Sequence, residues 1–197
     1  MSHSSAVTHA GESQESTTKL GFWIYLMTDC VLFGSLFATY IVLRDNTYGG
    51  VSGKDIFDMP FVLAETLILL TSSFVCGLTM LAARQGHRRW VLAGLSGVAL
   101  LGVSFLTLEL IEFGKLMAEG DTWQTSAFLS AFFTLVGTHG AHIAIGLLWL
   151  IVIGWQVAHR GLTSGVRRRL GLFGMFWHFL DVIWIFIFTI VYLMGVL

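Results

Sequence analysis

Five long apolar runs without a single lysine or arginine decide what this chain can fold into. A bilayer core about 30 Å thick takes about 20 helical residues to cross, and each run is long enough. The predicted spans are residues 21–43, 61–83, 90–113, 128–157 and 170–197. Because backbone groups in lipid must be paired within their own segment, we expect every run to be an α-helix. The predicted fold class is therefore all-α, an integral membrane bundle of five transmembrane helices.

The composition fits this fold. Only 12% of the residues are charged, whereas a soluble domain carries roughly 25%. The net charge of −1 leaves no basic face for phosphates, so nucleic acid is excluded as a partner. Residues 1–18 are polar and lack a hydrophobic period, which predicts a flexible N-terminal tail before one transmembrane domain, residues 19–197.

Basic residues in the connections predict the orientation in the membrane. Eight of the eleven lysines and arginines lie before the first span or in the second and fourth connections. Cytoplasmic loops carry the excess of Lys and Arg, so we expect the N-terminus in the cytoplasm and the C-terminus outside. The run Arg167, Arg168 and Arg169 is explained by this topology, with anionic lipid headgroups as an alternative partner.

Small residues four positions apart let membrane helices approach closely. Two such pairs occur, Ala93 with Gly97 in the third span and Gly137 with Ala141 in the fourth. We predict close helix contacts at both pairs.

Eight ionisable side chains interrupt the apolar runs: Asp29, Glu65, Glu109, Glu112, His139, His142, His178 and Asp181. Such groups are costly at membrane depth unless they are paired, hydrated or neutralised, so each is a candidate functional residue. We expect all of them to face the bundle interior. With no lysine or arginine in the spans, the carboxylates can bond histidine or hydroxyl groups, or stay protonated.

The spacing groups these residues further. Three pairs lie three positions apart and so share a helix face: Glu109 with Glu112, His139 with His142, and His178 with Asp181. Counting about 1.5 Å per residue puts the glutamates toward the outer side. Asp29, His178 and Asp181 fall in the inner half, and the two fourth-span histidines lie between. We therefore expect two polar clusters, linked through the fourth helix.

Several interpretations of these groups stay open. An interhelical hydrogen-bond network would hold the bundle together, and a proton path would use the same residues. Glutamate and histidine pairs on separate helices also resemble the ligands of a di-iron carboxylate site. The estimated depths argue against a metal, because Glu109 and His178 fall on opposite halves of the membrane. Heme ligation by the histidines is a further hypothesis, as is a small transporter or proton channel, although no inverted repeat is visible.

Three segments resemble subunit III of the heme–copper respiratory oxidases. They are residues 21–33 (Gly-Phe-Trp-Ile-Tyr-Leu-Met-Thr-Asp-Cys-Val-Leu-Phe), 136–146 (Val-Gly-Thr-His-Gly-Ala-His-Ile-Ala-Ile-Gly) and 176–186 (Phe-Trp-His-Phe-Leu-Asp-Val-Ile-Trp-Ile-Phe). Pro60 with Glu65, and residues 109–113 (Glu-Leu-Ile-Glu-Phe), are supporting matches. The likeness covers about residues 19–197.

This resemblance implies a chain without heme or copper of its own. It would lie in a bacterial inner membrane, with its C-terminus periplasmic, beside subunit I, which holds the hemes and copper, and with subunits II and IV. It would hold phospholipid in a cleft and support assembly, proton uptake and sustained turnover of subunit I. Lys19 falls where many members have a basic residue near lipid headgroups, and Asp29 falls where mitochondrial-type members have glutamate.

The branch within the family also follows from resemblance. Cytochrome c oxidase versions commonly have seven spans, and this chain lacks the first two. Its short form, with Gly-Lys-Asp-Ile-Phe at residues 53–57 and Gly-Leu-Thr-Ser at 161–164, resembles the cytochrome o branch. Those complexes oxidise ubiquinol, reduce oxygen and pump protons. Subunit III of a cytochrome c oxidase and a stand-alone di-metal oxidoreductase are the alternatives.

Overall fold

The computed structural model describes the backbone of residues 2–47 and 58–196 and the side chains from residue 16 onward. These ranges are helical, with no strand. The main helices are α1 (Ser2–Leu43), α3 (Met59–Gln85), α4 (Arg88–Glu119), α5 (Ala127–Arg160) and α6 (Ser164–Ile187). A π-helical segment η1 (Phe188–Leu193) and a short helix α7 (Met194–Val196) continue α6. Five helical segments are long and apolar enough to cross a membrane, which confirms the predicted fold class. The 53–57 motif lies outside the described residues.

Each helix runs past the span predicted from hydropathy, because helices end at specific stop signals rather than where the lipid ends. The residues after α3, α4 and α5 are Gly86, Gly120 and Gly161, each with a positive φ of 70° to 92°. Such left-handed conformations favour glycine and terminate a helix. At the other end, Ser126 accepts a hydrogen bond from the backbone N–H of Leu129 at 3.1 Å and so caps the start of α5.

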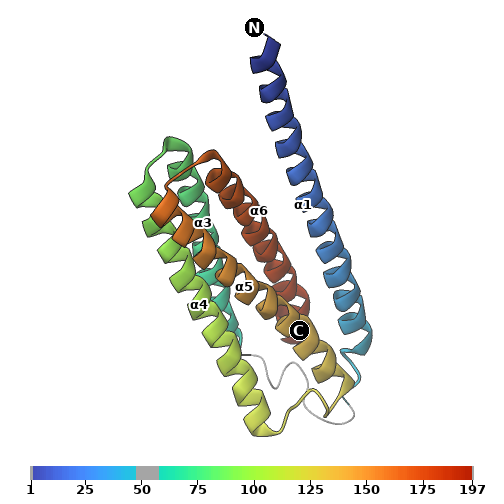
Figure 1. Cartoon of the computed structure of the whole chain (residues 1–197). Coiled ribbons are helices and arrows are strands. Elements are labelled where there is room, and N and C mark those ends of the chain that lie inside the picture. Colours follow the sequence, from blue (N-terminus) through green and yellow to red (C-terminus); the bar gives the residue numbers. More distant parts are fainter. Residues whose placement is uncertain (1, 48–57, 197) are drawn as a thin grey trace.

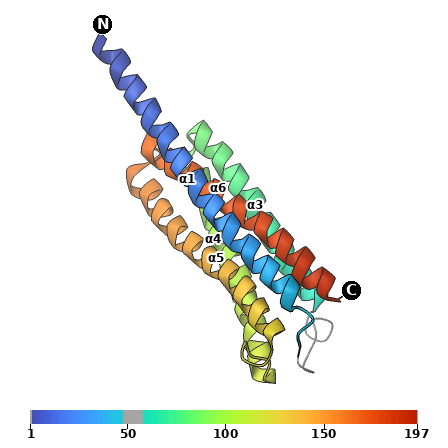
Figure 2. The ribbon, with the colours of Figure 1, turned by 90° about the vertical axis from the view of Figure 1, so that its right-hand side faces the viewer.

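The first helix extends furthest beyond its predicted span. α1 begins at Ser2, so residues 2–18 form helix where the sequence predicts a flexible tail. No proline lies between Ser2 and the span to stop the helix, and it therefore continues upstream. Figures 1 and 2 show this part of α1 projecting past the ends of the other helices. The mobility of the tail stays a prediction.

Helix α6 holds the bundle together. It packs against α1, α3 and α5, while α3 packs on α4 and α4 on α5 (Figures 1 and 2). Its buried side chains include Trp177 and Trp184, which are among the largest fully buried residues. The polar groups on α6 therefore lie where several helices can reach them.

The connections gather most basic residues at one end of the bundle. The turn between α3 and α4 and the turn between α5 and α6 lie at the same end (Figure 1), and we call it the arginine-rich end. There Arg88 donates a hydrogen bond to the carbonyl oxygen of Ala158 and ties the two turns together. Which side of the membrane this end faces stays a prediction.

Candidate functional site

Burial separates the eight candidate residues. Six are buried: Asp29, Glu65, Glu109, Glu112, His139 and Asp181. His142 is half-buried, whereas the side chain of His178 is 46% exposed. The expectation that all eight face the bundle interior is therefore wrong for His178, whose ring lies on the outer face of the α3–α6 contact.

Three glutamates form one cluster, as the sequence predicts. Glu65 on α3 lies close enough to Glu109 and Glu112 on α4 for electrostatic interaction. Tyr192 in η1 donates a hydrogen bond of 2.9 Å to Oε2 of Glu112. We call Glu65, Glu109, Glu112 and Tyr192 the glutamate cluster. Both carboxyl oxygens of Glu65 are buried without a hydrogen bond in the described part of the chain.

The sequence pattern does not single out Tyr192, because a tyrosine near a span end is ordinarily an interfacial anchor. The structure instead places Tyr192 in the π-helical segment η1, where it and Val191 are buried. Such π-helical turns frequently occur at functional sites. Nothing in the residue pattern signals that turn.

The predicted glycines Gly97 and Gly137 make ordinary helix contacts, and tighter ones lie beside the predicted pairs, at Gly94 and Gly140. A Cβ at Gly140 would collide with the carboxylate of Glu109, whose Cδ lies 2.9 Å from that position. A Cβ at Gly137 would lie at an ordinary 3.6 Å from Phe113. On α4, the close neighbour of Thr79 is Gly94 rather than Gly97. Gly140 is therefore the residue that lets Glu109 reach the surface of α5.

We expect Gly140→Ala to lower the free energy of unfolding by about 1–3 kcal/mol, since overpacking forces the Glu109 carboxylate to move. Gly137→Ala is the matched control on the same helix, and it should leave the thermal unfolding temperature unchanged. Thermal unfolding of the purified protein in detergent measures both. Equal effects of the two substitutions would contradict a special role for Gly140.

His139 lies in an aromatic box formed by α1, α4 and α6. Its ring centroid lies 5.3 Å from that of Trp184, 6.0 Å from that of Phe105 and 6.4 Å from that of Phe33. The imidazole is fully buried, and within residues 16–47 and 58–196 neither ring nitrogen has a hydrogen-bond partner. Its visible role is thus packing among rings, at the point where four helices meet.

Asp29 and His142 connect α1 to α5. Oδ2 of Asp29 lies 3.8 Å from Nε2 of His142, an ion-pair distance longer than a hydrogen bond. Nδ1 of His142 lies 2.7 Å from the carbonyl oxygen of Thr138. A carbonyl only accepts, so Nδ1 carries the hydrogen of that bond and a neutral ring has a lone pair at Nε2. Attraction between the facing atoms therefore requires one further proton, on the imidazole or on the carboxyl group.

His178 and Asp181 connect α6 to α3. Nδ1 of His178 lies 2.6 Å from Oγ of Ser73 and 3.7 Å from Oδ2 of Asp181. Asp29 contacts His142 on α5, whereas His178 contacts Ser73 and Asp181, so the residues of the expected inner cluster have different partners. Depth along a helix does not tell which neighbouring helix a side chain meets.

Tryptophans extend this polar contact along α3. Trp177 donates a hydrogen bond of 3.1 Å to Oγ of Ser72, and Trp184 donates one of 3.1 Å to Oγ1 of Thr66. The two indoles lie seven residues apart, which is two helical turns. Their regular spacing against hydroxyl residues was the available sequence signal for this contact. The α3–α6 interface is thus joined by hydrogen bonds in the membrane interior, where they stabilise helix association.

The ionisable pairs do not assemble into a metal site. In the part of the chain that the structure describes, no three His, Cys, Asp or Glu side chains come together so as to hold a metal ion. The histidine and glutamate pairs instead lie at separate helix contacts, so the di-iron pattern suggested by their spacing is not formed.

The candidate headgroup residues at the arginine-rich end make contacts within the chain. Arg167 donates to the carbonyl oxygen of Leu162 at 3.2 Å, and Arg169 donates to Oε1 of Gln156 at 2.8 Å. Both remain exposed. These bonds fix the turn between α5 and α6 and present positive charge near one membrane surface.

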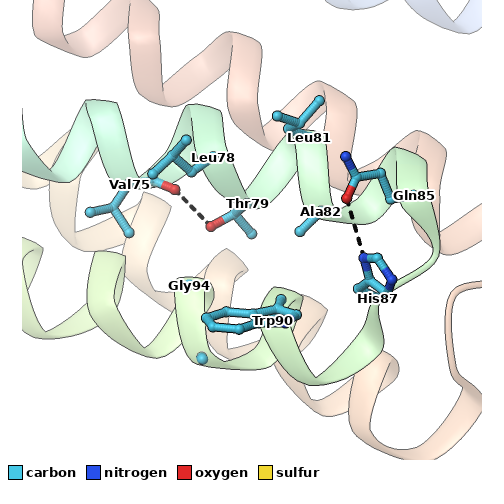
Figure 3. A pocket seen from close by; sticks show the side chains of 10 residues that line it. Val75, Leu78, Thr79, Leu81, Ala82, Gln85, His87, Trp90 and Gly94 are labelled. Atoms are coloured by element: carbon cyan, nitrogen blue, oxygen red, sulfur yellow. Dashed lines mark hydrogen bonds between the residues drawn. The ribbon is translucent and has the colours of Figure 1, made fainter.

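A groove of about 470 Å³ lies between α3 and α4, beside the arginine-rich end (Figure 3). The Trp90 indole forms one wall, and Gln85 and His87 contact each other at one end, with 3.2 Å between Oε1 and Nδ1 (Figure 3). Its remaining lining is mostly apolar. The Thr79 hydroxyl donates a hydrogen bond to the carbonyl oxygen of Val75, so it adds little polarity to the groove.

This geometry defines a class of protein, a multi-pass membrane bundle whose ionisable side chains meet at helix contacts. Comparison with known families then identifies which one. The family model described as cytochrome c oxidase subunit III matches residues 2–196, so the chain belongs to this family. The resemblance drawn from the first, fourth and fifth spans is confirmed.

Individual relatives agree with the cytochrome o branch. The chain is 54% identical over 189 residues to cytochrome bo(3) ubiquinol oxidase subunit 3 of Pseudomonas aeruginosa, covering 96% of this chain and 90% of the relative. It is 46% identical over 176 residues to quinol oxidase subunit 3 of Bacillus subtilis, covering 89% and 86%. Cytochrome c oxidase subunit 3 of Bacillus sp. strain PS3 is also 46% identical over 176 residues, covering 89% and 85%. Short length is therefore shared with a relative named for cytochrome c and does not by itself indicate a quinol oxidase.

Proposed function

We propose that this chain is subunit III of a proton-pumping ubiquinol oxidase in a bacterial inner membrane. The observation that carries the proposal is its 54% identity, over 96% of its length, to a subunit with that name. The complex would reduce oxygen to water with electrons from ubiquinol. Subunit III of a cytochrome c oxidase is the second candidate, because the Bacillus sp. strain PS3 relative bears that name.

Within this complex the chain supports the redox subunit without carrying a redox centre. Its partners in the proposal are subunit I, with the hemes and copper, and subunits II and IV. The arrangement of ionisable groups supports a structural and proton-related role, since Asp29, Asp181 and the glutamate cluster meet histidine, serine or tyrosine side chains at helix contacts. Such contacts hold helices together and are positioned to exchange protons.

Gentle detergent purification through a tag on this chain tests the proposal. We expect larger membrane subunits with heme spectra and copper to co-purify, and the dissociated chain to be colourless. Ubiquinol and reduced cytochrome c are then compared as electron donors for the purified complex. A chain that purifies alone with stoichiometric iron would contradict the proposal, and oxidation of cytochrome c alone would favour the second candidate.

The proposed orientation places the N-terminus and the arginine-rich end in the cytoplasm and the C-terminus in the periplasm. The grouping of eight basic residues supports it. Single cysteines at Ser164, the first residue of α6, and after Leu197 allow a direct test with an impermeant thiol reagent in intact cells, where only the second position should react.

Bound phospholipid is part of the proposal, with the α3–α4 groove as its site. The groove is apolar along its length, and its tryptophan and histidine end lies beside the arginine-rich turns. Tryptophan favours the membrane–water interface, and arginines there attract anionic headgroups. An acyl chain in the groove would therefore place its headgroup near Arg167, Arg168 or Arg169.

We expect Ala93→Trp to reduce the phospholipid that remains bound through purification, since Ala93 lines the groove and a large side chain there would fill it. Leu100→Trp is the matched control, at an exposed position two turns further along α4. Native mass spectrometry of the purified complex compares the lipid adducts. Equal lipid content in the two variants would contradict the groove as the site.

A further inference from the structure

His178 exposes an imidazole in the middle of a membrane span. Ser73 on α3 and His178 on α6 each follow the first residue of their helix by fourteen positions, about 21 Å along the axis. The two helices run in opposite directions, so this contact lies near the centre of both. Polar side chains at such depth almost always face protein or a water-filled cavity, because lipid tails offer no hydrogen bond.

Among the described residues, one nitrogen of the imidazole has no hydrogen-bond partner and is left for a partner outside the chain. Nδ1 is the atom that contacts Ser73 and Asp181. For Nε2, residues 16–47 and 58–196 supply no hydrogen bond. The half-buried Ser73 and the buried Asp181 carboxylate thus hold the ring in position while its second nitrogen points away from the chain's own polar groups.

The surface around His178 has the shape of a helix-packing site. A hollow of about 400 Å³ is lined by Leu70, Ser73, Phe74, Gly77, Leu78 and His178, which we call the His178 face. Phe74 is 68% exposed. A Cβ added to Gly77 would meet no atom within 4 Å, so the glycine leaves open space at the surface of α3. Small residues with large apolar neighbours are typical of surfaces on which membrane helices pack.

We infer that the His178 face docks a transmembrane helix of a neighbouring oxidase subunit, and that this helix gives a hydrogen-bonding side chain to Nε2 of His178. The inference rests on the proposed function and deepens it by naming the surface. A lipid acyl chain would fill the hollow but leave Nε2 without a hydrogen bond. The α3–α4 groove differs in this respect, because its polar residues lie at the membrane surface.

Photo-crosslinking in the intact membrane tests which molecule covers the face. A benzophenone amino acid replaces Phe74 and, as a control on another helix, Leu148 of α5, which is 65% exposed. We expect the Phe74 position to form an adduct with another oxidase subunit, identified by mass spectrometry. Adducts with lipid alone, or with a second copy of this chain, would overturn the inference, whatever the Leu148 position captures.

A steric test uses two glycines that have open space. Gly77→Trp fills the His178 face, whereas Gly114→Trp adds the same side chain to an exposed position of α4 that also lacks neighbours within 4 Å. A Cβ at either position meets no atom of the chain within 4 Å, so we expect both variants to fold. We expect Gly77→Trp to reduce co-purification of the heme subunits about tenfold relative to Gly114→Trp, a difference of about 1.4 kcal/mol.

The chemical test separates hydrogen bonding from packing. We expect His178→Leu to reduce co-purification of the heme subunits, and His178→Gln to retain most of it, because the amide keeps a donor and an acceptor. Normal co-purification of both Gly77→Trp and His178→Leu would overturn the docking inference but leave the proposed function intact. Failure of the unsubstituted chain to bring heme subunits would instead contradict the proposed function itself.

Discussion

Asp29→Ala should leave an oxidase that starts at a near-normal rate but loses activity faster during turnover. Asp29 is buried on α1 and lies 3.8 Å from His142 on α5. Its removal leaves a half-buried imidazole without its partner on α1, at a cost of about 1–3 kcal/mol. Because α1 packs mainly on α5 and α6 in the described part of the chain, this loss should loosen the helix rather than the whole chain.

The measurement compares initial rate, inactivation during continuous turnover and heme spectrum in the purified complex. We expect the initial rate to stay within about twofold and inactivation to accelerate. Asp29→Glu is the matched control, since it keeps the carboxylate and introduces the residue of mitochondrial-type members. Loss of the heme spectrum together with the initial rate would show that Asp29 acts on the redox subunit itself, contrary to this prediction.

Hydropathy predicted the five spans because the bilayer imposes a minimum length and forbids unpaired charge. It could not predict helix ends, which are set by local chemistry. α4 continues six residues past its predicted end at 113 and stops at Glu119, before Gly120. Gly120, which has a positive φ, and Ser126, which caps α5, mark these ends. Hydropathy does not detect them, because it measures only how apolar a segment is.

The sequence predicts which ionisable residues belong to the candidate site, but it does not predict which residues of other helices they contact. The cost of ionisable groups in lipid singles out Asp29 and His178 whatever the fold. Their partners depend on the rotation of each helix about its axis, which neither spacing nor depth determines. For the same reason Ser73 was missed, because a serine in a span is ordinary until a histidine from another helix lies 2.6 Å from it.

A large stability effect should come from the hydrogen bond between Tyr192 and Glu112. Both side chains are buried, and the phenol donates to Oε2 at 2.9 Å. Tyr192→Phe removes the donor and leaves a buried carboxyl group without it, which costs about 1–3 kcal/mol. Tyr40→Phe is the matched control. Tyr40 is equally buried, but its hydroxyl reaches the carbonyl oxygen of Val191 only at 3.4 Å, so its loss should matter less.

A double-mutant cycle decides whether the effect belongs to the pair. Glu112→Leu removes the acceptor and the buried carboxyl together, so adding Tyr192→Phe to it should cost less than Tyr192→Phe alone. The expected coupling is about 0.5–3 kcal/mol, measured by thermal unfolding of the four proteins in one detergent. Additive effects would mean that the Tyr192 hydroxyl does not act through Glu112. The glutamate cluster would then be held in place by its helices, and η1 would not contribute to it through Tyr192.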